Sequence, residues 1–387
     1  FQISASQRMR IGLNLIALRS THGAGVERFA RNVVGSMRLG DDQSLWIGIR
    51  AGAKLTNLLG EQFLNANIVA TVSKWHSWGT TSRLLIEMIF VCWKTYSLDV
   101  VLSVNNFGPL LGKSGQRKVV VIHDVWFLDS GFDGSGIKKW LFGALIRIQL
   151  LSTTHIITVS EFSKKAIVRH LNVDEKIVSV VPNCVPPGLI TIDDSLEGNR
   201  QKKVTDSAVP HEYFLMVGSD RPNKNIWRGV QGYLKFVKTK ANPPFLYIVG
   251  HYTDNYKTKL KSVVPQELAE SVIMRGFVSD NEYRQLIKGC IGLVFPSLYE
   301  GFGIPIVEAM VLGKQILVSR GTVCEEIAGE FGIPIDAKDE YQISLGLSQL
   351  FDRRSPDMTK IRSRHLSRYQ DCPCAGRDLL KALLVNG

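Results

Sequence analysis

The chain has 387 residues, of which 45% are hydrophobic and 21% are charged, a balance typical of a globular protein with buried cores. Its length favours two domains over one. The formal net charge of +12 indicates an anionic partner. Because the basic residues are spread along the chain and no zinc-finger or RNA-binding aromatic signature occurs, we expect a phosphorylated small molecule or an anionic lipid rather than nucleic acid.

The cysteines and the first residues bear on the compartment. Six cysteines stand at positions 92, 184, 290, 324, 372 and 374, and none belongs to a Cys-x-x-Cys pair. Residues 1–10 lack the apolar core of a secretory signal. We therefore expect reduced thiols in a cytoplasmic protein.

Two apolar stretches are too short to span a membrane. Residues 84–93 include Glu87 and are predicted to form a buried helix. Residues 137–151 contain three cations among apolar side chains. They are interpreted as a helix packed on a sheet with its cations extended into solvent, with contact to an anionic bilayer surface as the alternative. A peripheral position at the inner face of the membrane therefore stays open.

Short β-branched runs alternate with segments of helical period along the first half of the chain. This alternation predicts parallel strands covered by helices. Strands are expected at residues 11–18, 45–49, 99–104, 118–124, 155–160 and 177–182. Helices are expected between them, including residues 25–38, 81–96, 137–152 and 161–171.

Residues 186–210 interrupt this alternation with a polar stretch rich in Pro, Gly and Ser, which predicts an interdomain connection. Strands are expected again at residues 213–219, 245–250, 271–276, 291–296 and 315–319. The predicted fold is α/β, with two doubly wound, Rossmann-like domains at residues 1–187 and 188–367. A C-terminal helix at about residues 368–387 is expected to pack back on the first domain. Ligands of such sheets bind beyond the carboxyl ends of the strands, and the cleft between two facing domains is the expected active site.

Two groups of residues follow strands of the first domain. Gly23, Ala24 and Gly25 lie between a strand and a helix, where free backbone amides attract phosphate. The spacing is neither GxGxxG nor a Walker motif, so a plain turn between strand and helix is the alternative. His123 ends the strand in VIHDVWF. It either contacts a bound substrate or is satisfied by local hydrogen bonds.

The first strand of the second domain leads into MVGSDRPNKNIWRGV, residues 216–230. The strand ends at Gly218, a cationic loop follows, and a helix begins near Asn225, so Lys224 stands beside a helix N-terminus. A cation and the positive end of a helix dipole together favour a diphosphate. We prefer this interpretation to a solvated basic turn.

The segment LYEGFGIPIVEAM, residues 298–310, places Glu300 before a helix start and Glu308 one turn inside the helix. Glycines between them permit close backbone approach, and Pro305 suits a first helical turn. Two carboxylates placed in this way need not face each other as in a glycosidase, and capping of the helix is the other alternative. With the amides of residues 301–304 they are expected to form a polar rim for a hydroxyl-rich ligand with a phosphate nearby.

These segments resemble the retaining, nucleotide-sugar-dependent glycosyltransferases of the GT-B fold, family 4. Glu300 and Glu308 match the E-x7-E motif of that family, and VGSDRPNKN resembles its lysine-bearing phosphate loop. The segments IHDVWF, TVSEFSKK, VVPNCV and RGFVSDNEYRQLIKGC also resemble family segments. The resemblance covers nearly the whole chain in the right order, but it is poorly specific for the sugar.

The resemblance implies a role for each matching residue. Lys224 would neutralise the donor diphosphate, Glu300 would lie near the transferred sugar, and Glu308 would bind the ribose hydroxyls. His123 would contact the sugar or assist catalysis, so the implied catalytic residues are Glu300, Lys224 and His123. The other implied donor contacts are Gly25, Ser219, Arg221, Phe277, Val278, Gly301, Phe302, Gly303 and Ile304, with the backbone around Phe277 and Val278 reading the base.

Two positions depart from the pattern of the family. Ser219 stands where many members have an arginine, so either Arg221 supplies the missing charge or Lys224 acts alone. Cys184 replaces the glycine of the family's PNG segment at the hinge.

Transfer of a sugar requires stabilisation of charge on the departing diphosphate, which fixed cations and helix ends can supply. No Asp-x-Asp follows the expected strand pattern, so we expect neither a metal nor a cofactor. The expected reaction moves a hexose or deoxyhexose, with a slight preference for mannose from GDP-mannose, to a glycan or lipid-linked glycan. Alternatives are a UDP- or dTDP-sugar donor, a GT-B phosphorylase or epimerase, and a non-catalytic nucleotide-sugar or glycan-binding subunit.

Overall fold

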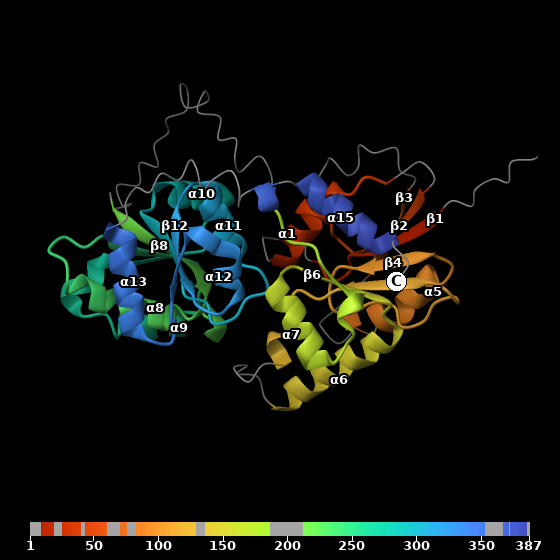
Figure 1. Cartoon of the computed structure of the whole chain (residues 1–387), viewed down its shortest axis with the longest axis horizontal. Coiled ribbons are helices and arrows are strands. Elements are labelled where there is room, and N and C mark those ends of the chain that lie inside the picture. The colour runs from red at the N-terminus through yellow and green to blue at the C-terminus, as the bar shows by residue number, and fades with distance from the viewer. Residues whose placement is uncertain are drawn as a thin grey trace, which may run out of the picture. The chain divides into compact units, whose positions relative to one another are not determined.

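The computed structural model describes most of the chain, and the statements below concern the described part. This part comprises residues 9–18, 25–39, 43–59, 70–75, 83–84, 86–128, 136–185, 212–352, 367–370 and 372–384. The chain divides into two compact units, residues 1–184 with 371–387 (unit 1) and residues 185–370 (unit 2). Each unit is built around a parallel sheet (Figure 1).

The sheet of unit 1 has seven strands in the order β3-β2-β1-β4-β5-β6-β7. Its strands are β1 (Met9–Asn14), β2 (Gln43–Arg50), β3 (Ala70–Trp75), β4 (Val100–Ser103), β5 (Arg117–Val121), β6 (His155–Thr158) and β7 (Val178–Val180). Its α-helices are α1 (Gly25–Asn32), α2 (Leu55–Leu59), α5 (Val91–Thr95), α6 (Gly136–Ser152), α7 (Glu161–Leu171) and α15 (Cys372–Leu384). The π-helix η2 (Ile86–Phe90) and the 3-10 turns η1 (Val34–Ser36), η3 (Trp126–Leu128) and η4 (Glu175–Ile177) complete the described elements.

The sheet of unit 2 has six strands in the order β10-β9-β8-β11-β12-β13. Its strands are β8 (Tyr213–Ser219), β9 (Phe245–His251), β10 (Val272–Gly276), β11 (Gly292–Phe295), β12 (Gln315–Ser319) and β13 (Gly332–Ile335). Its helices are α8 (Ile226–Val237), α9 (Asp254–Lys261), α10 (Asp280–Gly289), α11 (Ile304–Val311), α12 (Val323–Ala328) and α13 (Glu340–Asp352), with 3-10 turns η7 (Pro222–Lys224), η8 (Gln266–Ser271) and η9 (Gly329–Phe331). In each sheet the strand order reverses direction once, between β1 and β4 and between β8 and β11, and ligands of doubly wound sheets bind beyond the strand ends at such a point.

The predicted α/β fold with two doubly wound sheets is confirmed, and two strands were missed. Strand β3 in ATVSKW is short and has few of the β-branched residues that mark the other strands. Strand β13 in GIPI contains Pro334, which argues against a strand in a sequence pattern. It forms because β13 is the edge strand and pairs only with β12, so the missing amide of Pro334 costs little.

The prediction of a buried helix at residues 84–93 is wrong in part. This segment continues through the π-helix η2 into α5, and Ile89, Phe90 and Trp93 are exposed. Val91 is buried against the sheet in a cluster with Leu98 and Val101. The apolar run therefore supplies an inner face that packs and an outer face that does not.

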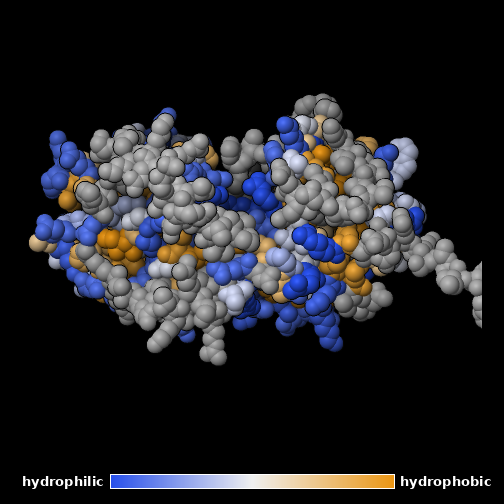
Figure 2. All heavy atoms as spheres, turned by 90° about the horizontal axis from the view of Figure 1, so that it is seen from above, coloured by the Kyte–Doolittle hydropathy of each residue, from blue (hydrophilic) through white to orange (hydrophobic). Residues whose placement is uncertain are grey.

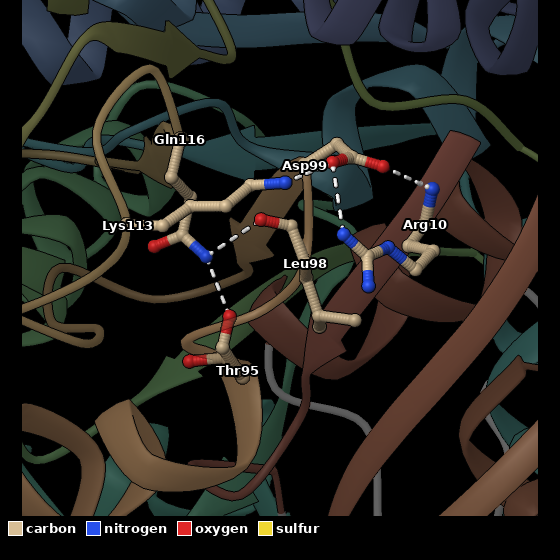
Figure 3. A network of polar contacts seen from close by, with 6 residues as sticks. All are labelled: Arg10, Thr95, Leu98, Asp99, Lys113 and Gln116. Carbon is tan, nitrogen blue, oxygen red and sulfur yellow. Dashed lines mark hydrogen bonds and ion pairs between the residues drawn. The ribbon is translucent and has the colours of Figure 1, made fainter. Parts of the chain in front are cut away.

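A polar network holds the end of α5 to the sheet (Figure 3). Gln116 donates from Nε2 to the carbonyl of Thr95 at 2.5 Å, and Asp99 accepts from the amide of Arg10 at 2.7 Å. Lys113 pairs with Asp99 as well. Because these contacts lie between residues of β1, the end of α5 and the loop before β5, they fix the η2–α5 segment on unit 1.

Glu87 in η2 is a buried carboxylate, with an ion pair to Arg83 at 3.3 Å between Oε2 and Nε. Desolvation raises the pKa of Glu87 from 4.5 to about 7, and the charge of Arg83 opposes this only in part. Between these two values the folded protein holds a proton that the unfolded chain has released. The free energy of unfolding therefore falls as the pH rises from 4.5 to about 7.

We expect Glu87→Gln to remove this pH dependence. A shift of this size corresponds to about 3 kcal/mol of stability above neutral pH. Chemical denaturation at several values from pH 5 to pH 8 measures the effect, and the difference between the variant and the parent chain should grow with pH. A difference that stays constant over this range would contradict the pKa of Glu87 given above.

The expectation of six reduced cysteines is wrong for two of them. Cys184 and Cys372 form a disulfide, with their Cα atoms 5.4 Å apart, a separation normal for disulfides. Both belong to unit 1, and the bridge joins the segment after β7 to the start of α15. They lie 188 residues apart in sequence, so no local pattern indicates the pairing. Cys92, Cys290, Cys324 and Cys374 are free thiols.

The C-terminal helix α15 packs on unit 1. Gly376 approaches so closely that an added Cβ would lie 2.6 Å from the carbonyl of Ser36, and Arg117 donates to the carbonyl of Ala382 at 3.2 Å. On the face drawn in Figure 2, hydrophilic residues surround separate hydrophobic patches. None of the helices described is both long and apolar enough to cross a membrane.

Candidate functional site

The phosphate loop predicted at residues 219–225 and the predicted Glu300 lie together at the carboxyl edge of the unit 2 sheet. Strands β8 and β11 are neighbours, so the loops that follow them meet at the point where the strand order reverses. Lys224 Nζ lies 2.6 Å from Glu300 Oε1, and it also lies 5.6 Å from the ring centroid of Phe295. Both side chains of the ion pair are mostly but not fully buried, so a ligand at this edge can reach them.

The loop bearing Lys224 has a defined local conformation. Pro222 opens the turn η7, and Asn225 ends it with a φ of 56° in the left-handed region, which Asn tolerates better than most residues. Helix α8 begins directly afterwards at Ile226. Lys224 therefore stands at the start of a helix, as the sequence predicts.

Two asparagines attach this loop to its neighbours. Asn225 is buried and donates from Nδ2 to the carbonyls of Pro296 at 3.1 Å and Ala337 at 2.7 Å. Asn223 donates to the carbonyl of Tyr299 at 2.9 Å, and its own carbonyl accepts from the amide of Leu298 at 2.8 Å. These bonds set the distance between Lys224 and Glu300. The prediction from sequence did not include either asparagine, because their partners lie more than 70 positions away.

Glu308 lies in α11 and is almost fully buried. Its Oε2 accepts a hydrogen bond from Tyr283 Oη at 2.8 Å, a residue of α10 that the sequence did not single out. Glu300 and Glu308 thus have different partners, so the two carboxylates do not form an acid/base pair with each other. The helix begins after Gly303, whose φ of 92° favours glycine, and no side chain caps this end. Capping of α11 by Glu300, one of the alternatives above, is therefore wrong.

Residues 301–304 surround the start of α11. The side chains of Phe302 and Ile304 are buried, and the Phe302 ring packs edge-on against Tyr369 with centroids 5.8 Å apart. A ligand at this edge would therefore meet the backbone of Gly301, Phe302, Gly303 and Ile304 rather than their side chains.

The remaining residues predicted in unit 2 lie at strand ends of the same sheet. Ser219 is the last residue of β8, and Arg221 is exposed at the start of the phosphate loop. Phe277 and Val278 follow β10, with the Phe277 side chain 64% exposed. The arginine of the family is thus replaced by Ser219 at the strand end and Arg221 on the surface.

Two buried polar atoms near these loops have no hydrogen-bond partner within the described part of the chain. They are Asn223 Oδ1 in the phosphate loop and Ser319 Oγ at the end of β12. Buried polar groups in proteins are nearly always paired, so each is a candidate for contact with a bound ligand. No sequence motif marked either residue.

Two of the predicted residues lie in unit 1. Gly25 is the first residue of α1, and an added Cβ would meet no atom within 4 Å, so packing does not require glycine there. Gly23 and Ala24, predicted as part of the same loop, lie outside the described residues.

His123 follows β5 in unit 1. Its Nε2 lies 3.0 Å from the carbonyl oxygen of Val104, which can only accept, so Nε2 carries the proton and Nδ1 is left as an acceptor. Its ring meets Phe29 edge-on at 5.3 Å. Desolvation lowers the pKa of His123 to about 4, against a smaller opposing effect of the hydrogen bond. His123 is therefore neutral at physiological pH and would act there by hydrogen bonding and not as a cation.

The described residues contain no group of three or more His, Cys, Asp or Glu side chains placed to hold a metal ion. Independence from metal remains a prediction, because nothing here tests it.

Two family models match the chain, one over each half. The model described as Glycosyltransferase Family 4 matches residues 24–189, and the model described as Glycosyl transferases group 1 matches residues 198–365. Together they extend over most of both units.

Curated relatives and solved structures agree with these matches. The O-antigen chain mannosyltransferase RfbU of Salmonella typhimurium is 28% identical over 312 residues, which are 78% of this chain and 79% of that protein. The O-antigen chain mannosyltransferase B of Escherichia coli is 30% identical over 197 residues, half of each chain. The crystal structure of Anabaena Alr3699/HepE in complex with UDP and glucose aligns with a TM-score of 0.70 at 16% identity, over 97% of this chain and 99% of that one. The last likeness concerns the fold alone.

Proposed function

The chain belongs to the GT-B glycosyltransferases whose two halves the Family 4 and group 1 models describe, and on this basis we propose that it transfers a hexose from a nucleotide sugar with retention of configuration and without a metal. The observation that supports this most directly is the Lys224–Glu300 pair at the edge of the unit 2 sheet. It lies where β8 and β11 end and where α8 and α11 begin. Sites at such edges in doubly wound sheets bind nucleotides.

The proposed chemistry depends on charge that develops on the departing diphosphate. The ammonium of Lys224 and the amide groups at the start of α11 would stabilise this charge from fixed positions, so the protein need not reorganise during the reaction. Glu300 holds Lys224 in place and would lie beside the sugar end of the donor. Glu308, oriented by Tyr283, would accept hydrogen bonds from the ribose hydroxyls. His123 would contribute a hydrogen bond in its neutral form.

The proposed donor is GDP-mannose and the proposed acceptor is a glycan or lipid-linked glycan. Two mannosyltransferases of O-antigen chains among the relatives support the sugar and the class of acceptor. The base is supported only by the resemblance of VGSDRPNKN to mannosyltransferase loops, so a UDP- or dTDP-sugar is the alternative. A cytoplasmic protein at the inner face of the membrane remains our proposal, although the Cys184–Cys372 disulfide removes part of the original reason for it.

A panel of nucleotide sugars tests this function. We expect release of nucleoside diphosphate from GDP-mannose at a higher rate than from UDP- and dTDP-sugars, and no change when EDTA is added. An inactive variant such as Lys224→Met corrects for contaminating hydrolases. Tight nucleotide binding without release from any donor would favour the binding-subunit alternative. Loss of all release in EDTA would contradict the absence of a metal.

A further inference from the structure

Unit 1 exposes an unusual amount of apolar surface on one helical layer. Nine of the twelve large hydrophobic side chains exposed in the described residues belong to η2–α5, the following loop and α6. We call this set the outer helical face; it consists of Ile89, Phe90, Trp93, Tyr96, Leu111, Trp140, Leu141, Ile148 and Leu151. Scattered exposed hydrophobic residues are normal, but a concentration on adjacent elements indicates a binding surface.

The spacing of these residues makes each element amphipathic in the opposite sense to a normal surface helix. Positions 140, 141, 148 and 151 share one side of α6, and positions 89, 90, 93 and 96 share one side of η2–α5. Trp93, Trp140 and Leu151 are 86%, 72% and 89% exposed. The opposite side of each element is already used for the core, where Val91 and Ile146 pack. The outer side therefore remains to be covered by something other than this unit's own core.

The two elements are held on either side of one loop. Leu110 donates its amide to the carbonyl of Met88 in η2, and Gly108 donates its amide to Gln149 Oε1 in α6 at 3.0 Å. Leu111, which follows, is exposed. The network of Figure 3 fixes the end of α5 below this loop. The outer helical face is thus a braced surface and not a single loose helix.

The charges around this face are of one sign. Lys94 and Arg147 are exposed beside it, and within the described segments 86–96, 105–113 and 136–152 the only carboxylate is that of Glu87, which is buried. A hollow of about 510 Å³ between α6 and α7 has Lys139, Trp140, Arg147 and His170 in its lining, so cations stand next to the most exposed aromatic ring of α6. Exposed aromatic and aliphatic side chains bordered by cations are the pattern of a protein that lies on an anionic membrane surface.

We propose that the outer helical face docks unit 1 on a bilayer containing anionic phospholipid, with Trp93 and Trp140 inserted at the level of the headgroups. The proposal extends the interpretation of residues 137–151 to a second element, η2–α5, which the sequence placed in the core. It deepens the proposed function, since a lipid-linked acceptor would be presented at such a surface. Binding itself needs neither donor nor acceptor.

Flotation of the full chain with vesicles tests this proposal. We expect at least about tenfold more protein on phosphatidylcholine–phosphatidylglycerol vesicles than on phosphatidylcholine alone, and release of the bound protein at high salt. The double variant Trp93→Ser/Trp140→Ser should lose most of this binding. The matched control Tyr341→Ser/Leu345→Ser removes two exposed hydrophobic side chains from α13 of unit 2 and should bind like the parent chain.

Three further results decide between outcomes. The charge variant Lys94→Glu/Arg147→Glu should bind anionic and neutral vesicles equally weakly. Equal binding by the parent chain and the tryptophan variant would overturn the proposal. So would a stable dimer in sedimentation velocity that the tryptophan variant dissociates, because the face would then contact a second copy of the chain. Release of nucleotide from soluble donor should be the same in the tryptophan variant and the parent, so a failed function and a failed membrane surface give different results.

Discussion

Replacement of Lys224 by methionine should lower the turnover number by about two to three orders of magnitude, the usual loss when one fixed electrostatic contact to a developing charge is removed. Methionine keeps most of the length of the lysine stem over the Phe295 ring, so the packing of the loop should survive. The measurement is release of nucleoside diphosphate at saturating donor. The Michaelis constant should change less than turnover, because the charge on the diphosphate grows as the sugar departs.

The chain offers a matched control for this variant. Lys235 in α8, the helix that follows the phosphate loop, forms an ion pair with Glu340 at 3.5 Å, and both side chains are more exposed than those of the Lys224–Glu300 pair. Lys235→Met makes the same chemical change and should leave turnover within about twofold, because exposed ion pairs contribute little. If Lys224→Met also remained within twofold of the parent, the assignment of the diphosphate to this loop would be wrong.

Replacement of Glu300 by glutamine should separate turnover from nucleotide binding. Turnover should fall by about a hundredfold, because the carboxylate that orients Lys224 and faces the sugar end of the donor is lost. Affinity for the free nucleoside diphosphate should instead rise, since Lys224 no longer has a carboxylate 2.6 Å away as its counter-charge. Isothermal titration with GDP and UDP measures this affinity, and the same two ligands compare the proposed bases.

Glu340→Gln, in the surface pair with Lys235, serves as the control and should change neither quantity. If Glu300→Gln lowered turnover and nucleotide affinity together, Glu300 would be needed mainly to hold the loop in place. A loss of thermal stability in the same variant would support that different role.

Much of the fold and part of the site could be predicted because the signals are local. Alternation of apolar runs and helical segments predicted most strands, and Gly218, Lys224 and Gly303 stand at strand and helix ends as expected. The two missed strands lacked such signals: β3 has few β-branched residues, and β13 contains Pro334. His123 shows the limit of a motif, since its resemblance implied a catalytic contact while burial and the bond to Val104 decide its protonation.

The sequence by itself determined that this is an α/β protein with cationic and acidic residues at strand ends, because hydrophobic period, turn residues and charge are properties of short segments. Only the tertiary structure decided which partners those residues have. The bond from Tyr283 to Glu308 and the disulfide between Cys184 and Cys372 each join residues far apart in the chain, and such contacts depend on how strands and helices pack. The same reason applies to η2–α5. An apolar run shows that a segment can be buried, but only the packed neighbours show which of its sides is covered.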